Sequence, residues 1–252
     1  MRIIDFHTHL DGRWFDAPLL DQASFMAGMD RCCIDRACVF TLMGFYEDTA
    51  PHNDALLERA AKSPGRLLPF ITVDPKLGDA AVSELDRCIA TGKFRGVKFH
   101  SWVQAFAPSM VKPTMIAILE RAAEADLPVL FHDGKPPYST TFQIAAAARW
   151  VPNAKVVLGH AGLADYVDVA AQMIRDVENL YGCVCGPRIG DVEHLVKVAG
   201  AHKLIFGSDF GLSDWMIIDD RLDSIRLAAI TDEQRERILW RNAAELLKLP
   251  LA

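Results

Sequence analysis

Eight short apolar segments, which recur about every 30 residues and alternate with amphipathic stretches, constrain the fold of this 252-residue chain more than any other feature. They predict strands at residues 2–6, 36–42, 67–73, 96–100, 129–132, 155–159, 180–185 and 204–207. Helical periodicity occupies residues 18–31, 53–63, 78–91, 113–125, 140–150, 164–177, 189–200 and 231–247. Strands that are each followed by a helix must run parallel, because the helix carries the chain back to the start of the next strand.

Two parallel architectures fit this alternation, a closed barrel and an open doubly wound sheet. Eight repeats in about 250 residues are typical of the (β/α)8 barrel. The first strand-to-helix turn also lacks the GxGxxG sequence of dinucleotide-binding sheets. No linker rich in proline, glycine or serine divides the chain. We therefore predict an α/β fold with a single (β/α)8 TIM barrel over residues 1–252, regular or slightly distorted.

Charge and composition narrow the classes of function. The 27 Lys and Arg against 33 Asp and Glu give a formal net charge of −6, which disfavours nucleic acids and anionic membranes as partners. No apolar run reaches the roughly 20 residues of a membrane-spanning helix, and the N-terminus has no apolar signal segment. The six cysteines show no CxxC spacing. We expect a cytoplasmic protein that acts on a small molecule.

The end of the first predicted strand carries two histidines, in the sequence IDFHTH. Side chains alternate along a strand, so His7 and His9 project from the same side. Two such imidazoles can bind a single ion such as Zn²⁺, although a pair of hydrogen-bonded surface histidines would read the same way. In a barrel the strand ends meet at one mouth, where active sites assemble. The other polar residues at the ends of predicted strands are His100, His132, His160 and Asp209.

Taken together, the segments IDFHTH, GVKFH, LPVLFH, LGHAG and IFGSDFG resemble the amidohydrolase superfamily, specifically its amidohydrolase-2 branch of metal-dependent hydrolases and decarboxylases. The resemblance spans nearly the whole chain and extends to a terminal helix at residues 238–249, which contains Asn242. It implies one divalent metal ion, Zn²⁺ or alternatively Mn²⁺, and is compatible with a homodimer. It also implies Asp209 and His160 as catalytic residues, and the implied metal ligands are His7, His9, His132 and Asp209.

Substrate contacts are expected from the loops that follow the strands. Cations beside aromatic rings in such loops suit a carboxylated, aromatic or lactone-like substrate. For Arg188 an exposed rim position is an equal alternative. The predicted substrate-binding residues are His100, Trp102, Tyr138 and Arg188.

Lys98 lies two residues before His100, so it faces the same side of its strand and lies deeper in the barrel. Superfamily members with two metals often carry a carboxylated lysine on this strand, but the branch that the chain resembles generally uses one metal. A buried lysine is seldom left without a partner. We therefore expect an ion pair between Lys98 and Asp5.

The leading hypothesis is a metal-dependent hydrolase, in which a metal-activated water attacks an amide, ester or lactone. Non-oxidative decarboxylation of an aromatic or unsaturated acid needs the same ligands. The short chain favours hydrolysis, since the decarboxylases of the branch that the chain resembles are usually longer and carry an inserted region. A TatD-type nuclease would place a glutamate near the end of the fourth strand, where this sequence reads GVKFH. A non-enzymatic relative would usually have lost a ligand residue, and none is lost here.

Overall fold

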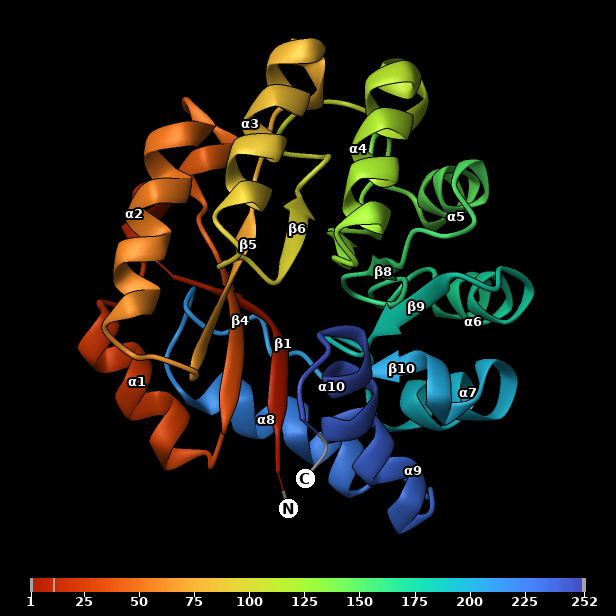
Figure 1. Ribbon diagram of the computed structural model, residues 1–252. Helices are drawn as coiled ribbons and strands as arrows, with labels where there is room; N and C mark the ends of the chain where they lie inside the picture. The colour runs from red at the N-terminus through yellow and green to blue at the C-terminus, as the bar shows by residue number, and fades with distance from the viewer. Residues whose placement is uncertain (1, 11, 251–252) are drawn as a thin grey trace.

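Eight parallel strands form the barrel in the computed structural model, which describes residues 2–10 and 12–250. Each strand pairs with the next in chain order, and the helices lie outside them (Figure 1). The predicted (β/α)8 barrel and all eight predicted strands are confirmed, with boundaries that differ by a few residues. The strands are β1 (Ile4–His9), β4 (Arg36–Phe40), β5 (Leu67–Ile71), β6 (Gly96–Phe99), β7 (Val129–Phe131), β8 (Val156–Leu158), β9 (Leu180–Cys183) and β10 (Leu204–Ile205).

The last strand closes the barrel against the first. The main-chain N–H of Phe6 donates to the carbonyl of Phe206 at 2.9 Å, and the N–H of Asp209 donates to the carbonyl of His7 at 2.8 Å. Beyond the end of β10, Phe210 forms a parallel bridge with β1. The two ends of the chain therefore meet along one seam, and residues 7 and 209 are neighbours across it.

Strand β1 shifts its register against β4 between residues 5 and 8. Such a bulge interrupts the alternation of side chains between the two faces of a strand. As a result, the consecutive residues Phe6 and His7 both contact rings inside the barrel. The ring of Phe6 lies 5.5 Å from that of Phe70, and the ring of His7 lies 5.3 Å from that of Phe40. The irregularity falls on the segment that carries the two predicted ligand histidines.

Helices connect successive strands and bury their apolar faces against the sheet. One apolar cluster fills the space between strands and helices, and a second fills the inside of the barrel. Side-chain caps mark several helix starts; Asp21, for example, accepts the N–H of Ser24 at 2.8 Å. The connecting helices are α1 (Gln22–Arg31), α2 (Thr49–Ala61), α3 (Asp79–Ala90), α4 (Lys112–Glu124), α5 (Thr141–Trp150), α6 (Val167–Asp176) and α7 (Ile189–Ala199).

The helical span expected over residues 231–247 is present in the C-terminal part of the chain, but a π-helical turn divides it into three consecutive parts. It forms α9 (Asp232–Glu236), a π-helical turn (Arg237–Arg241) and α10 (Asn242–Leu246), and a further helix, α8 (Met216–Arg226), precedes them. The side-chain amide of Asn242 donates to the carbonyls of Ala201 and Leu204 at 2.6 and 2.7 Å. These bonds fasten the terminal segment to the start of β10.

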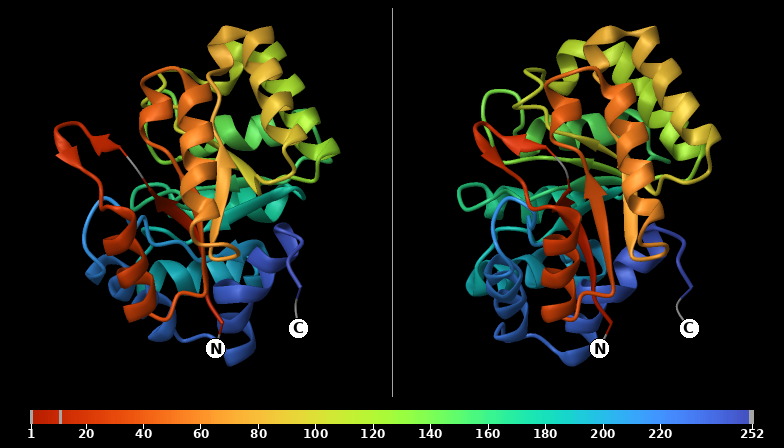
Figure 2. Two further views of the ribbon diagram at one scale, coloured as in Figure 1. Left: turned by 60° about the vertical axis from the view of Figure 1, so that its left-hand side comes forward. Right: turned by 90° about the vertical axis from the view of Figure 1, so that its left-hand side faces the viewer.

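A two-stranded hairpin, β2 (Arg13–Trp14) and β3 (Ala17–Pro18), follows β1. It projects from the barrel away from both chain ends, which lie together at the opposite side (Figure 2). The hairpin therefore stands beside the end of the barrel at which the strands finish. None of the described helices is long and apolar enough to cross a membrane.

Candidate metal centre

The carboxyl ends of four strands place the predicted ligand residues at one end of the barrel. His7 and His9 belong to the last half of β1, and His132 follows β7 directly. His160 lies just beyond β8, and Asp209 lies beyond β10. Because the strands are parallel, these ends open into the same mouth.

His7, His9 and Asp209 form a group whose potential ligand atoms lie within 4.8 Å of one another. The Nε2 atom of His9 lies 3.1 Å from Oδ1 of Asp209, and Nε2 of His7 lies 3.5 Å from the same oxygen. Both histidines are buried, whereas the Asp209 side chain is 32% exposed and so can reach the mouth. Two imidazole nitrogens and a carboxylate oxygen are donors that suit Zn²⁺ or Mn²⁺.

Hydrogen bonds to main-chain carbonyls determine which nitrogen carries the proton in two of the rings. Nδ1 of His7 lies 2.9 Å from the carbonyl oxygen of Gly159, and Nδ1 of His160 lies 2.7 Å from that of Cys185. A carbonyl oxygen only accepts, so each Nδ1 donates, and Nε2 of each neutral ring keeps its lone pair. His7 therefore presents a lone pair that can bind a cation, in the manner of metal-ligating histidines held by a carbonyl.

A hydrogen bond from His132 to His160 similarly determines which nitrogen of His132 carries the proton. Nε2 of His160 lies 2.9 Å from Nδ1 of His132, and in the neutral form of His160 the former accepts and the latter donates. Nε2 of His132 is then left with a lone pair, and this buried atom has no hydrogen-bond partner among the described residues. Buried polar atoms rarely lack a partner, so this nitrogen fits a bound cation. His132 does not belong to the 4.8 Å group and approaches it through His160, whose ring centroid is 4.7 Å from that of His7.

Burial and hydrogen bonds determine the charges of these groups. Burial lowers the pKa of His7, His9 and His132, which keeps the rings neutral. Burial alone would raise the pKa of Asp209, but its hydrogen-bonded partner His9 and the other histidine rings around it hold the pKa well below its usual range. His7 can therefore offer its Nε2 lone pair directly. Nε2 of His9 donates to the carboxylate of Asp209, so its proton must move before this nitrogen binds a cation, and Nδ1 of the same ring, which has no partner among the described residues, can take it.

A buried carboxylate from β1 holds the main chain beside the ligands. Asp5 accepts the N–H of His7 at 3.2 Å, the N–H of Ser208 at 3.0 Å and the hydroxyl of Ser208. Burial raises the pKa of Asp5 to about 7, although these bonds act in the opposite direction. Asp5 thereby joins the strand that bears His7 to the residue that precedes Asp209. This role is not among those expected from the sequence, although a charged residue inside an apolar strand indicates buried partners.

Asp133 has the same function beside His160, and the sequence does not predict it either. It accepts the main-chain N–H of His160 at 2.6 Å and that of Gly162 at 2.7 Å.

We expect Asp133→Asn to lower the free energy of unfolding by roughly 2–3 kcal/mol, because the amide NH₂ would face one of these donors. Urea denaturation measures the change. The exposed Asp165→Asn is the control and should stay within about 0.5 kcal/mol of the wild type; equal stability of the two variants would contradict the role of Asp133.

Lys98 is fully buried inside the barrel, as predicted, but the expected ion pair with Asp5 is wrong. Nζ of Lys98 lies 3.0 Å from Nε2 of His7 instead. Both oxygens of Asp5 accept hydrogen bonds from Ser208, so they are engaged elsewhere.

A stack of flat rings forms a wall beside the ligands. The ring of His100 lies 3.9 Å from that of His132 at an interplanar angle of 15°, and 5.8 Å from that of Trp14 at 26°. Phe45 and Trp102 approach His100 at 5.6 and 6.4 Å. Two of the predicted substrate-binding residues, His100 and Trp102, therefore adjoin the predicted ligands, and the hairpin adds Trp14 to them.

The other two predicted substrate-binding residues lie on loops after β7 and β9. Tyr138 is half-buried and Arg188 is exposed. Within the described parts of the chain, no hydrogen bond or ion pair ties either side chain to a ligand residue. The main-chain N–H of Arg188 donates to Asp191 at 2.9 Å at the start of α7. Substrate binding by these two residues stays a prediction.

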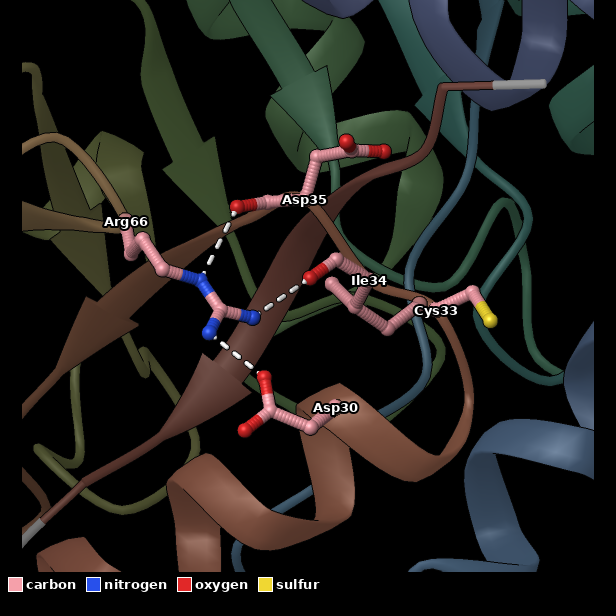
Figure 3. Close-up of a pocket in the computed structure, with 5 residues that line it drawn as sticks. All are labelled: Asp30, Cys33, Ile34, Asp35 and Arg66. Atoms are coloured by element: carbon pink, nitrogen blue, oxygen red, sulfur yellow. Dashed lines mark hydrogen bonds and ion pairs between the residues drawn. The ribbon is translucent and has the colours of Figure 1, made fainter.

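A pocket of about 470 Å³ at the end of the barrel where the strands begin is not part of this centre (Figure 3). The guanidinium of Arg66 donates to the carboxylate of Asp30 at 2.5 Å and to the carbonyls of Ile34 and Asp35 at 2.9 and 3.4 Å. Its charge is therefore already satisfied by the protein, and the pocket offers no free cation to a ligand.

Comparison with known proteins gives one family and a set of similar folds. The model of the amidohydrolase family matches residues 4–249. No curated protein matches the chain. The chain superposes on 5-carboxyvanillate decarboxylase from Sphingomonas paucimobilis with a TM-score of 0.76 and 16% identity, over 99% of each chain. A dihydroxybenzoic acid decarboxylase from Polaromonas sp., with bound manganese and the inhibitor 2-nitroresorcinol, gives 0.74 and 18%, over 98% of this chain and 97% of that one. The 4-oxalomesaconate hydratase from Rhodopseudomonas palustris gives 0.72 and 16%, over 98% and 95%.

At these identities the likeness concerns the fold, but it bears on one expectation from the sequence. The match spans 97% or more of either decarboxylase chain. The match therefore gives no support to the expectation that hydrolysis is favoured over decarboxylation.

Proposed function

Since this chain belongs to the amidohydrolase family, we propose that it is a metal-dependent decarboxylase, which removes CO₂ from a small aromatic or unsaturated carboxylic acid without an oxidant. The observation that carries the proposal is the wall of rings formed by His132, His100 and Trp14 beside the group of His7, His9 and Asp209. The faces of His100 are covered by its neighbours in this stack, so we propose that a planar acid binds along the edge of the stack, with its carboxylate toward the proposed ligands. The decarboxylases among the similar structures support this choice over hydrolysis.

His7, His9, His132 and Asp209 would hold one divalent cation. When bound, it supplies positive charge that binds the carboxylate and spreads the negative charge that develops as the carbon–carbon bond breaks. Both Zn²⁺ and Mn²⁺ suit nitrogen and oxygen donors, and we propose Zn²⁺ first and Mn²⁺, which one similar structure contains, as the alternative. Elemental analysis of the purified protein identifies the ion.

Other residues of the chain would orient the substrate, attract its charge and transfer a proton. The wall of rings orients the substrate plane, and Arg188 at the rim would attract its negative charge. As the carbon–carbon bond breaks, its electron pair stays on the substrate carbon and takes up one proton while CO₂ leaves. Asp209 adjoins His7 and His9 and its side chain is 32% exposed, so we propose that it relays this proton from solvent. His160 holds Nδ1 of His132 and thereby keeps that ring oriented.

Hydrolysis of an ester, lactone or amide is the second candidate, because the ionised Asp209 could equally take a proton from an attacking water. One experiment separates the two reactions. The metal-loaded protein is incubated in D₂O enriched in ¹⁸O with dihydroxybenzoates, an unsaturated diacid, an aryl ester and a lactone. A decarboxylase releases CO₂ and places deuterium on the product carbon without ¹⁸O in the organic product. Incorporation of ¹⁸O into a product carboxylate, with no CO₂, would instead establish hydrolysis.

We further propose that the protein works in the cytoplasm on a small molecule, as a monomer or a homodimer, and binds no nucleic acid. The described cysteines are all free, as is usual in a reducing compartment. The net charge of −6 supports a partner other than a polyphosphate.

A further inference from the structure

Lys98 contributes a buried cation to the metal centre, and its nearest polar contact is one of the proposed ligands. Its side chain is fully buried, with Nζ 3.0 Å from Nε2 of His7 and 4.6 Å from the centre of the Phe40 ring. Among the described residues no carboxylate forms an ion pair with Lys98. Both carboxylate oxygens of Asp5 accept hydrogen bonds from Ser208 instead. A buried ammonium needs a hydrogen-bond acceptor, and here the acceptor is an imidazole.

The direction of this hydrogen bond follows from the opposite side of the ring. Nδ1 of His7 donates to the carbonyl of Gly159, so Nε2 carries no proton in the neutral ring and must accept from Nζ of Lys98. The lone pair that accepts this hydrogen bond is the one with which His7 would bind a metal. One lone pair cannot serve an N–H group and a divalent cation at the same time.

We propose that Lys98 competes with a divalent cation for Nε2 of His7 and thereby limits the affinity of the centre for divalent cations. A cation that binds His7 must displace the ammonium and then remain beside its positive charge. The alternative position for Nζ is constrained, because Lys98 comes from the middle of β6 and is enclosed by the barrel. The inference rests on the proposed ligands but not on the proposed reaction.

Metal affinity, measured without any substrate, tests this inference. The protein is stripped with a chelator and titrated with Mn²⁺ or Zn²⁺ in competition with a fluorescent chelator. Lys98→Met removes the competing N–H groups and the charge, so the Kd should fall about ten-fold or more. Lys98→Arg keeps the charge and should not bind more tightly than the wild type. Lys62→Met removes the same charge from the surface and should leave the Kd unchanged.

The outcomes distinguish the two proposals. If the wild type binds Mn²⁺ and Lys98→Met binds it no more tightly, the inference about Lys98 is wrong while the ligand set survives. Equal tightening by Lys98→Arg or Lys62→Met would also overturn it, because the effect would not follow the charge at this position. If no variant binds either ion, the ligand set itself is wrong. Should Lys98→Met fail to fold, as circular dichroism would show, Lys98→Gln undergoes the same titration with the same expected fall in Kd.

Discussion

Removal of the divalent cation by a chelator is expected to lower kcat about 10³-fold or more, and addition of Zn²⁺ or Mn²⁺ should restore it. Decarboxylation and hydrolysis both place negative charge on substrate atoms next to the ligands. Without the cation, the neutral rings of His7, His9 and His132 offer no comparable positive charge, because burial holds their pKa values low. The loss should therefore appear in kcat and not only in KM.

Two variants separate the loss of metal from unspecific damage. His9→Asn removes a nitrogen of the group that converges with Asp209, so we expect loss of bound metal by elemental analysis together with loss of activity. His202→Asn changes an exposed histidine and should retain both metal and rate. Full activity of exhaustively chelated protein, with no metal detected, would refute the metal-dependent mechanism.

A single methyl group at Gly211 is expected to disrupt the seam of the barrel. Gly211 has a φ of +111°, and a Cβ built there would lie 1.8 Å from the carbonyl oxygen of His9. This oxygen belongs to the backbone of β1, so it cannot move away without moving His9. We expect Gly211→Ala to lower the free energy of unfolding by roughly 3 kcal/mol or more and to weaken metal binding, because strain and overlap add.

The matched control is the same substitution at Gly190, in the first turn of α7, where a Cβ would meet nothing within 4 Å. Gly190→Ala should be neutral or stabilise the protein by up to about 1 kcal/mol, since alanine is the better helix former. Urea denaturation of both variants, followed by metal titration of the folded protein, measures the difference. If Gly211→Ala unfolds at the wild-type midpoint and binds metal normally, the seam tolerates change, and our account of it fails.

Much of this architecture is predictable because local sequence and tertiary structure agree. Each predicted strand is a short apolar run, and each ends in the fold within a few residues of where the run ends. The parallel order then determines that polar residues after different strands meet, which brings His7, His9 and Asp209 together without any structural information.

The helix α8 was not predicted from the sequence. Its buried residues Ile218, Leu222 and Ile225 have helical spacing, so a signal exists in the sequence. Four charged residues between positions 219 and 223 surround them, and the pattern of one helix per strand assigns the final crossover to residues 231–247. The alternation of one strand with one helix gives no reason to expect an additional helix between β10 and the final helical span.

The partner of Lys98 could not be predicted, because the sequence shows which groups are buried but not which of them pair. Asp5 and Lys98 both lie inside the barrel, and opposite charges suggest an ion pair. The outcome depends on Ser208, whose N–H and hydroxyl both bond to Asp5 only once β10 has closed against β1. The order of protons through His160 and His132 is equally a property of the assembled barrel.

The closure of β10 onto β1 also links metal supply to the lifetime of the protein. His7 and Asp209 lie about 200 residues apart in the sequence, so the ligands that we propose come together only in the folded barrel, and a cation bound by them would stabilise that state alone. At a free metal concentration 100 times the Kd, such binding would add about 2.7 kcal/mol to the free energy of unfolding. In a metal-starved cell this protein should thus be degraded faster, so its abundance as well as its activity would follow the intracellular concentration of the ion.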